Sequence, residues 1–351
     1  MFECDIPSAS AVYRNMYGGY SINAQVNQRG WYFLMWVIML SVLAAHLLAD
    51  IRRSPDFSPY VGITENLMSS NFSDLVPFET FSRGMLMISV RVFDDASKAV
   101  IFVHWINSLI FFGGFVLVTQ LNKDNWQGAL LAFATYGVLL CFVTLRATPA
   151  YLIAIYAVLN QRLKLSSCMI LLILAACFHI TALLVVPALL ANYLSLRLSF
   201  KTHFKIYWCI YIIGIVSYVA IMLGLNFGAA LGGFLGEYDD LVKFVTYAEE
   251  PQVASVAHRI YFLLMAILVA MFLWNKTEKI RKQKIFVCVS FAIVALSSIS
   301  PVVAFRQSIY FTFPMLLIFP WGKWINSDVK AIVFWITFIS LSLLNFISVF
   351  F

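Results

Sequence analysis

Charged side chains are scarce in this sequence. Of its 351 residues, 12% are charged and 62% are hydrophobic, whereas a soluble domain carries about 25% charged residues and under half apolar ones. No soluble core could bury that much apolar surface, so the composition excludes a soluble globular protein. The formal net charge of +7 does not indicate nucleic-acid binding, because the aromatic residues are spread through apolar runs and interleave with no basic cluster.

Metal-site and disulfide patterns are also missing. The six cysteines include no Cys-x-x-Cys pair and no Cys/His pair at metal-ligand spacing. Five of them lie in apolar runs, where we expect small buried side chains. No Asp-x-Asp-like pair stands beside the isolated arginines; the nearest acidic pair is Asp239-Asp240. The sequence therefore predicts neither a metal nor a cofactor.

No cleavable signal peptide is evident. The first thirty residues are polar, and the first apolar run begins at Trp31, which favours an uncleaved signal-anchor. We expect residues 1–30 to be a cytosolic segment and residues 31–351 to form one membrane domain. This domain is predicted to be an all-α, polytopic transmembrane bundle of about eleven spans, with external segments near 50–97 and 226–258.

Several predicted helices are short or broken. The run at 149–159 allows only about three turns. The run at 166–193 is too long for one upright span of about 20 residues, so we expect a break near His179 and a kink at Pro187. Segments 60–68 and 80–92 are moderately amphipathic and could lie at the interface or re-enter. Glycine-rich, acidic sequence between 224 and 250 favours a mobile loop or lid.

The distribution of charge predicts which ends of the spans face outward. With a cytosolic N-terminus, fifteen of the 24 basic residues fall in cytosolic segments, and the acidic residues divide the other way, as the positive-inside rule requires. The isolated ionisable residues of the apolar sequence then converge on the outer face. They are Arg146, His179, His258, Arg259 and Arg306.

Each of these residues has a structural and a functional interpretation. Arg146 and Arg306 either snorkel to headgroups or pair with a carboxylate, or they bind phosphate oxygens in a bidentate manner. His179 is either a core histidine bonded to a backbone carbonyl or a general base, because imidazole exchanges protons near neutral pH. Glu79, in the apolar context Pro-Phe-Glu-Thr-Phe, is either a solvated loop acid or a partly buried base. Asp56 is the other acidic candidate.

Five motifs occur in a recognisable order. They are Asp56-Phe-x-x-Tyr60, Phe78-Glu79, Leu145-Arg146-x-x-Pro149, Ala176-Cys-Phe-His179-Ile-Thr-Ala-Leu183 and Ala304-Phe-Arg306-x-x-x-Tyr310-Phe. In this order, and with this number of spans, the chain resembles the EpsG-like/Wzy family of bacterial polysaccharide polymerases. These enzymes extend O-antigen, capsule or exopolysaccharide chains.

The resemblance implies a metal-independent glycosyltransferase of the GT-C type in the bacterial cytoplasmic (inner) membrane, with its active site facing the periplasm or exterior. It implies transfer of a glycan from undecaprenyl diphosphate to the sugar of a second lipid-linked repeat unit, with inversion and without a cofactor. Partners would be the lipid-linked oligosaccharide and membrane lipid, with a chain-length regulator and a flippase as further candidates.

The resemblance also assigns roles to residues. Arg146, Arg306 and Arg259 would bind the diphosphate, because cations stabilise the charge that develops on the leaving group. Glu79 or His179 would serve as the base near the acceptor hydroxyl. Contacts to sugar are assigned to a third set, namely Asp56, Tyr60, Arg83 and Tyr310.

Two other classes of protein stay open. A membrane O-acyltransferase of surface polysaccharide has a similar length, but it typically carries an early histidine motif, and no histidine precedes His46. A flippase or transporter of lipid-linked oligosaccharide would place charges along a path through the midplane, usually within a longer, internally symmetric array. Labelled acetyl incorporation without chain growth would favour the acyltransferase.

Overall fold

The structure is a computed structural model of the chain. It describes residues 29–43, 50–54, 56–69, 79–144, 147–196, 198–223, 255–275 and 278–321, and six isolated positions between 329 and 343. All regular elements within these residues are helical. The expected segment 1–30 (apart from its last two residues), Arg146 and the Gly-rich stretch at 224–250 lie outside the described residues.

The described helices form an apolar bundle. Three of them are long and apolar enough to cross a membrane, namely α4 (Ala96–Gln120), α9 (Phe200–Met222) and α12 (Val256–Trp274). Shorter apolar helices accompany them: residues 29–43, α6 (Ala147–Leu159), α7 (Leu165–Phe178), α14 (Lys284–Leu296) and α15 (Pro301–Ile318). The prediction of an all-α membrane bundle with several short helices is confirmed.

The long apolar run at 166–193 breaks at His179. Helix α7 ends at Phe178, and His179 takes an extended conformation with φ −155° and ψ 120°. A 3-10 turn, η5 (Ile180–Leu184), follows and leads into α8 (Val185–Ser195). Pro187 falls in the first turn of α8, where its missing N–H is not needed by the helix. It therefore helps to begin a helix, whereas we had expected it to kink one.

Two hydrophobic clusters hold the bundle together. The main core joins α4, α6, α7, α12, α14 and α15 around fully buried aromatic side chains, among them Phe111, Phe272, Phe291 and Phe311. A smaller cluster seats α2 (Phe57–Met68) and α3 (Thr80–Phe93) on the first turns of α4, through side chains such as Tyr60, Met87 and Val103. The two amphipathic segments are therefore helices that pack on α4.

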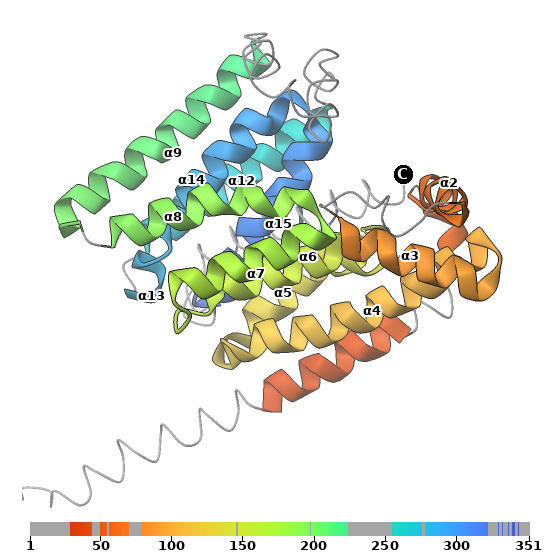
Figure 1. Cartoon of the computed structure of the whole chain (residues 1–351). Helices are drawn as coiled ribbons and strands as arrows, with labels where there is room; N and C mark the ends of the chain where they lie inside the picture. The colour runs from red at the N-terminus through yellow and green to blue at the C-terminus, as the bar shows by residue number, and fades with distance from the viewer. Residues whose placement is uncertain are drawn as a thin grey trace, which may run out of the picture.

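Different elements lie at the two ends of the bundle. Helices α2 and α3 lie at one end, and the short α13 (Glu278–Arg281) lies at the opposite end (Figure 1). The basic turn at 160–164 starts α7, whereas His179 ends it, about 20 Å away at 1.5 Å per residue. The remaining elements are short: η1 (Ile51–Arg53), η3 (Lys123–Asn125), α5 (Trp126–Val138), the π turn η4 (Leu139–Val143) and η7 (Ser297–Ile299).

Helix α5 packs unusually closely on the end of α15. The Asn125 amide donates to the carbonyl oxygens of Leu317 and Phe319 at 2.8 and 2.6 Å, which satisfies groups that the end of a helix leaves unpaired. Gly128 makes this approach possible, because a Cβ there would meet the Leu316 carbonyl oxygen and would lie 2.6 Å from Asn125 Nδ2. Small residues at such crossings allow backbones to come together in membranes.

Gly128→Ala is therefore expected to destabilise the protein by about 1–3 kcal/mol through overpacking. Gly113→Ala in α4 is the matched control, because a Cβ there meets nothing within 4 Å, and alanine is the better helix former by about 1 kcal/mol. Thermal unfolding in detergent measures both variants. Equal melting temperatures for the two would contradict the packing described at Gly128.

Candidate active site

Glu79 and His179 lie together where α3 begins and α7 ends. His179 Nδ1 is 3.2 Å from Glu79 Oε1, and their side chains are only 14% and 13% exposed. The distance suits an ion pair when the imidazole is protonated, although the two atoms are not aligned as a hydrogen bond. Two residues separated by a hundred positions in the sequence therefore form one acid–base pair, shielded from most of the solvent.

The start of α3 is fixed on the end of α7 by several contacts. The Ser82 hydroxyl lies 3.0 Å from the carbonyl oxygens of both Glu79 and Phe178. The Glu79 N–H donates to the Ala176 carbonyl at 3.3 Å, and the rings of Phe81 and Phe178 are 5.3 Å apart. These contacts set the position of both members of the pair.

Glu79 itself has a strained backbone. Its φ of 63° is left-handed, a conformation that residues other than glycine rarely adopt. Strain of this kind persists only where the surrounding structure imposes it, and it is concentrated at functional sites. The anchoring of α3 on α7 supplies the constraint, and it directs the carboxylate toward His179.

Arg83 follows Glu79 by one helical turn, and its backbone N–H donates to the Glu79 carbonyl oxygen at 3.0 Å. Residues at this spacing share a face of a helix. The Arg83 Nε atom is buried and has no hydrogen-bond partner within the part of the chain that the structure describes. A buried guanidinium donor without a partner is available to a ligand.

Asp56 and Arg306 form a second pair. Arg306 Nη2 lies 3.6 Å from Asp56 Oδ2, and the side chains are 39% and 26% exposed respectively. Asp56 precedes α2, whereas Arg306 lies in the second turn of α15 and not at a hairpin tip. Tyr60 stands one turn after Asp56 and is buried. At this distance, the Asp56 carboxylate leaves some of the N–H donors of the Arg306 guanidinium unoccupied.

Tyr310 connects the two pairs. It lies one turn after Arg306 in α15, and its hydroxyl is 3.1 Å from the Thr181 hydroxyl in η5. Thr181 follows His179 by two residues, so this contact joins the helix of the second pair to the break that positions the first. The predicted residues Asp56, Tyr60, Arg306 and Tyr310 are thus connected through contacts to the Glu79–His179 region.

Two predicted cations are not part of this arrangement. Arg146 lies outside the described residues, between Thr144 and Ala147. Arg259 is exposed in the first turn of α12. No contact described for Arg259 involves either pair, so its role stays a prediction.

The chain was compared with known families and proteins. The profile of the EpsG family matches residues 31–351. The chain belongs to the EpsG family. No curated protein and no solved structure matches it. Membership in the EpsG family indicates a glycosyltransferase-like enzyme of polysaccharide polymerisation that acts on lipid-linked sugars, and together with the apolar helices it indicates a membrane protein.

Sequence reasoning missed three side chains of this candidate site. Ser82 and Thr181 anchor the two pairs through backbone and hydroxyl contacts, which only the fold reveals. Tyr151 is fully buried in α6 beside Tyr310, with ring centroids 4.6 Å apart. One signal for Tyr151 was available in the sequence, because a hydroxyl within a short, otherwise apolar helix needs a partner.

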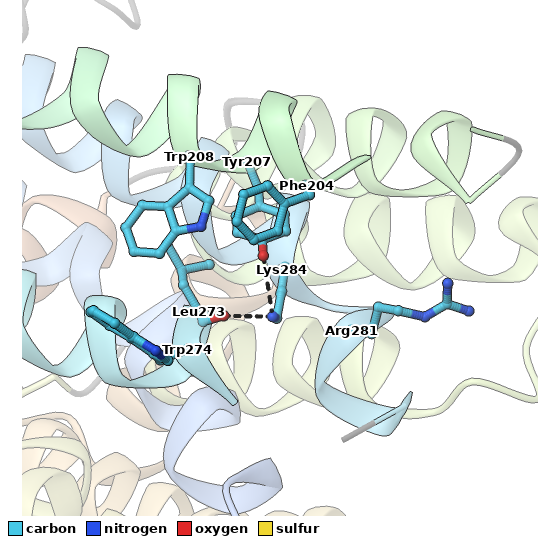
Figure 2. A pocket seen from close by; sticks show the side chains of 7 residues that line it. All are labelled: Phe204, Tyr207, Trp208, Leu273, Trp274, Arg281 and Lys284. Atoms are coloured by element: carbon cyan, nitrogen blue, oxygen red, sulfur yellow. Dashed lines mark hydrogen bonds between the residues drawn. The ribbon is translucent and has the colours of Figure 1, made fainter. Parts of the chain in front are cut away.

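A separate pocket of about 490 Å³ opens near α13, at the other end of the bundle from α2 and α3. Aromatic side chains of α9 line it together with Trp274, Arg281 and Lys284 (Figure 2). Lys284 Nζ donates to the Leu273 carbonyl oxygen at 2.5 Å and lies 4.8 Å from the Tyr207 ring centroid. Lys284 therefore stabilises the C-terminal end of α12, and no predicted site residue lines this pocket.

The described residues contain no cluster of three His, Cys, Asp or Glu side chains placed to hold a metal ion.

The two left-handed residues of α3 provide a test of the site. Glu79 precedes the helix and Asp94, with φ 48°, follows it. Glycine adopts this conformation without a steric penalty, so Glu79→Gly and Asp94→Gly are both expected to melt at the same temperature as the wild type or higher. Only Glu79→Gly is expected to lose polymer formation, because it removes the carboxylate of the pair.

Melting temperatures in detergent and gel analysis of the glycan measure these outcomes. Full-length polymer from Glu79→Gly would remove Glu79 from the catalytic machinery. Loss of polymer from Asp94→Gly as well would show that the effect is not specific to the Glu79 carboxylate, and it would contradict the prediction.

Proposed function

We propose that this EpsG-family protein polymerises lipid-linked repeat units at the outer face of the bacterial cytoplasmic membrane. The observation that carries the proposal is the family match over residues 31–351. The clustering of Glu79, His179, Asp56 and Arg306 at one end of the bundle supports it. The donor is a glycan on undecaprenyl diphosphate, and the acceptor is a second lipid-linked unit. The chain would then be a Wzy-like enzyme of the GT-C type, serving O-antigen, capsule or exopolysaccharide synthesis.

The reaction is a direct displacement. The acceptor hydroxyl attacks the anomeric carbon of the donor sugar, the bond from that carbon to the diphosphate oxygen breaks, and the lipid diphosphate leaves with the electron pair. The configuration at the anomeric carbon inverts. The proton of the acceptor hydroxyl passes to the Glu79–His179 pair, whose low exposure excludes most of the water that would compete for it.

Arginine supplies the positive charge for the leaving group. The Arg306 guanidinium has planar donors suited to phosphate oxygens and keeps its charge at all working pH values. Its half-exposed position beside Asp56 leaves room for an anion. Arg146 and Arg259 are the further candidates for the same diphosphate. Since these cations neutralise the developing charge, the proposed chemistry requires no metal and no cofactor.

The acceptor and donor sugars need hydrogen-bonding groups beside these pairs. Asp56 pairs with Arg306, Tyr60 follows Asp56 by one turn in α2, Tyr310 follows Arg306 by one turn in α15, and Arg83 follows Glu79 by one turn in α3. The Nε atom of Arg83 is buried and has no hydrogen-bond partner among the described residues, so it is the donor best placed to bind a sugar oxygen. Contacts of this kind orient the acceptor hydroxyl toward the pair that takes its proton.

Arg306→Ala is expected to stop chain growth in cells and to leave lipid-linked single units in the membrane. Arg306→Lys should restore little activity, because lysine cannot reproduce a bidentate contact. Arg162→Ala is the matched control, since Arg162 is exposed in the basic turn at the opposite end of α7. Gel analysis of surface glycan, at equal protein level, measures the three variants. Normal chain lengths from Arg306→Ala would exclude the proposed role of Arg306.

Reconstitution of the purified protein separates the proposed function from its rivals. Lipid-diphosphate-linked single units should be converted to longer chains, with one lipid diphosphate released for each bond formed. Incorporation of acetyl groups without chain growth would instead identify an acyltransferase. Movement of intact units across the bilayer without bond formation would identify a flippase.

A further inference from the structure

Tyr151 presents a buried hydroxyl without a partner. Its side chain is fully buried in α6, and its hydroxyl makes no hydrogen bond within the residues that the structure describes. Burying a hydroxyl in this way costs free energy, and native proteins rarely leave one unpaired without a reason. Nearby tyrosines do have partners: Tyr136 and Tyr261 are joined to each other at 3.1 Å, and Tyr310 is joined to Thr181 at 3.1 Å.

The surroundings of this hydroxyl point to an anionic ligand. Tyr151 packs on Tyr310, which follows Arg306 by one turn of α15, so the hydroxyl and the Arg306 guanidinium belong to neighbouring helices. The Tyr310 ring holds the Tyr151 ring in place at a centroid distance of 4.6 Å. The hydroxyl therefore lies in α6 at its contact with α15, the helix that carries the guanidinium assigned to the diphosphate.

We propose that the Tyr151 hydroxyl donates a hydrogen bond to a phosphate oxygen of the lipid diphosphate that Arg306 binds. A neutral donor beside a cation adds a directed contact to an anion without adding repulsion between like charges. Tyr151 is buried in an apolar helix, which keeps water from forming a hydrogen bond with the hydroxyl. The ligand then supplies the missing hydrogen-bond partner. This inference rests on the proposed function for the identity of the ligand.

Tyr151→Phe removes the hydroxyl and leaves the ring that packs against Tyr310. Because that hydroxyl makes no hydrogen bond to any described residue, the variant is expected to melt at the same temperature as the wild type or higher. Loss of one hydrogen bond to a charged group should weaken binding of a farnesyl-length prenyl diphosphate by about 10- to 100-fold. The matching prenyl alcohol lacks the phosphates, so both proteins should bind it equally well.

Tyr211→Phe is the control variant. The Tyr211 hydroxyl donates to the Ala266 carbonyl oxygen at 3.0 Å, between α9 and α12. Its removal should lower the melting temperature and leave binding of the prenyl diphosphate unchanged. Tyr151→Phe is thus expected to weaken binding without lowering the melting temperature, and Tyr211→Phe to lower the melting temperature without weakening binding. This difference separates a contact to the ligand from a contact within the fold.

Binding of each probe is measured by microscale thermophoresis of the detergent-solubilised full-length chain, and melting is followed separately. Equal affinity of Tyr151→Phe and wild type for the prenyl diphosphate overturns the inference. So does failure of the wild type to bind that probe, or a fall in the melting temperature of Tyr151→Phe. Polymer formation by the wild type is scored independently, so the inference and the proposed function can fail separately.

Discussion

The attachment of α3 to the broken end of α7 is the constraint on which the rest of the site depends. An uninterrupted helix through His179 would direct its imidazole along the bundle wall and would leave no carbonyls for Ser82. Because the chain is extended at His179, the Ser82 hydroxyl reaches Phe178 at 3.0 Å. The left-handed backbone at Glu79 then holds the carboxylate 3.2 Å from the imidazole. The contacts at this junction offset the cost of the strained backbone at Glu79 and of the break in the helix at His179.

Polar groups inside an apolar bundle show where ligands are expected. Most buried hydroxyls here return to a backbone carbonyl one turn earlier, as Thr119 does at 2.8 Å, which satisfies them without tertiary partners. Others join helices, as Tyr310 joins α15 to η5. Among the described residues several buried polar atoms do neither, and two of them are near the ion pairs: Arg83 Nε one turn after Glu79, and the hydroxyl of Tyr151, whose ring contacts Tyr310. Some of the unmet hydrogen-bonding capacity of the described residues is thus located next to the two ion pairs, where a sugar diphosphate would supply partners.

Hydropathy and length were sufficient to predict much of this fold. The short helix after Arg146 and the break near His179 both follow from runs that are too short or too long for one span. The distribution of basic turns predicted that Arg146, His179, His258, Arg259 and Arg306 gather on the outer face; this gathering stays a prediction. The pairing of Asp56 with Arg306 did not follow, since 250 positions separate them and only the packing of α2, α4, α6 and α15 brings them together. Ser82 and Thr181 were missed because single polar residues carry no periodic signal, whereas Tyr151 was missed although a hydroxyl within a short apolar helix was a usable signal. The predicted roles of the site residues stay predictions.

A double-mutant cycle on Glu79 and His179 tests the central claim most directly. The rates of polymer formation of Glu79→Gln, His179→Asn and the double variant are measured with purified, equally folded proteins on lipid-diphosphate-linked units. If the two groups handle the proton as one unit, either single change removes nearly all of the activity, and the double variant is no slower than the slower single variant. Losses that multiply in the double variant would show that the two residues act independently, and they would contradict the account of the junction as the catalytic centre.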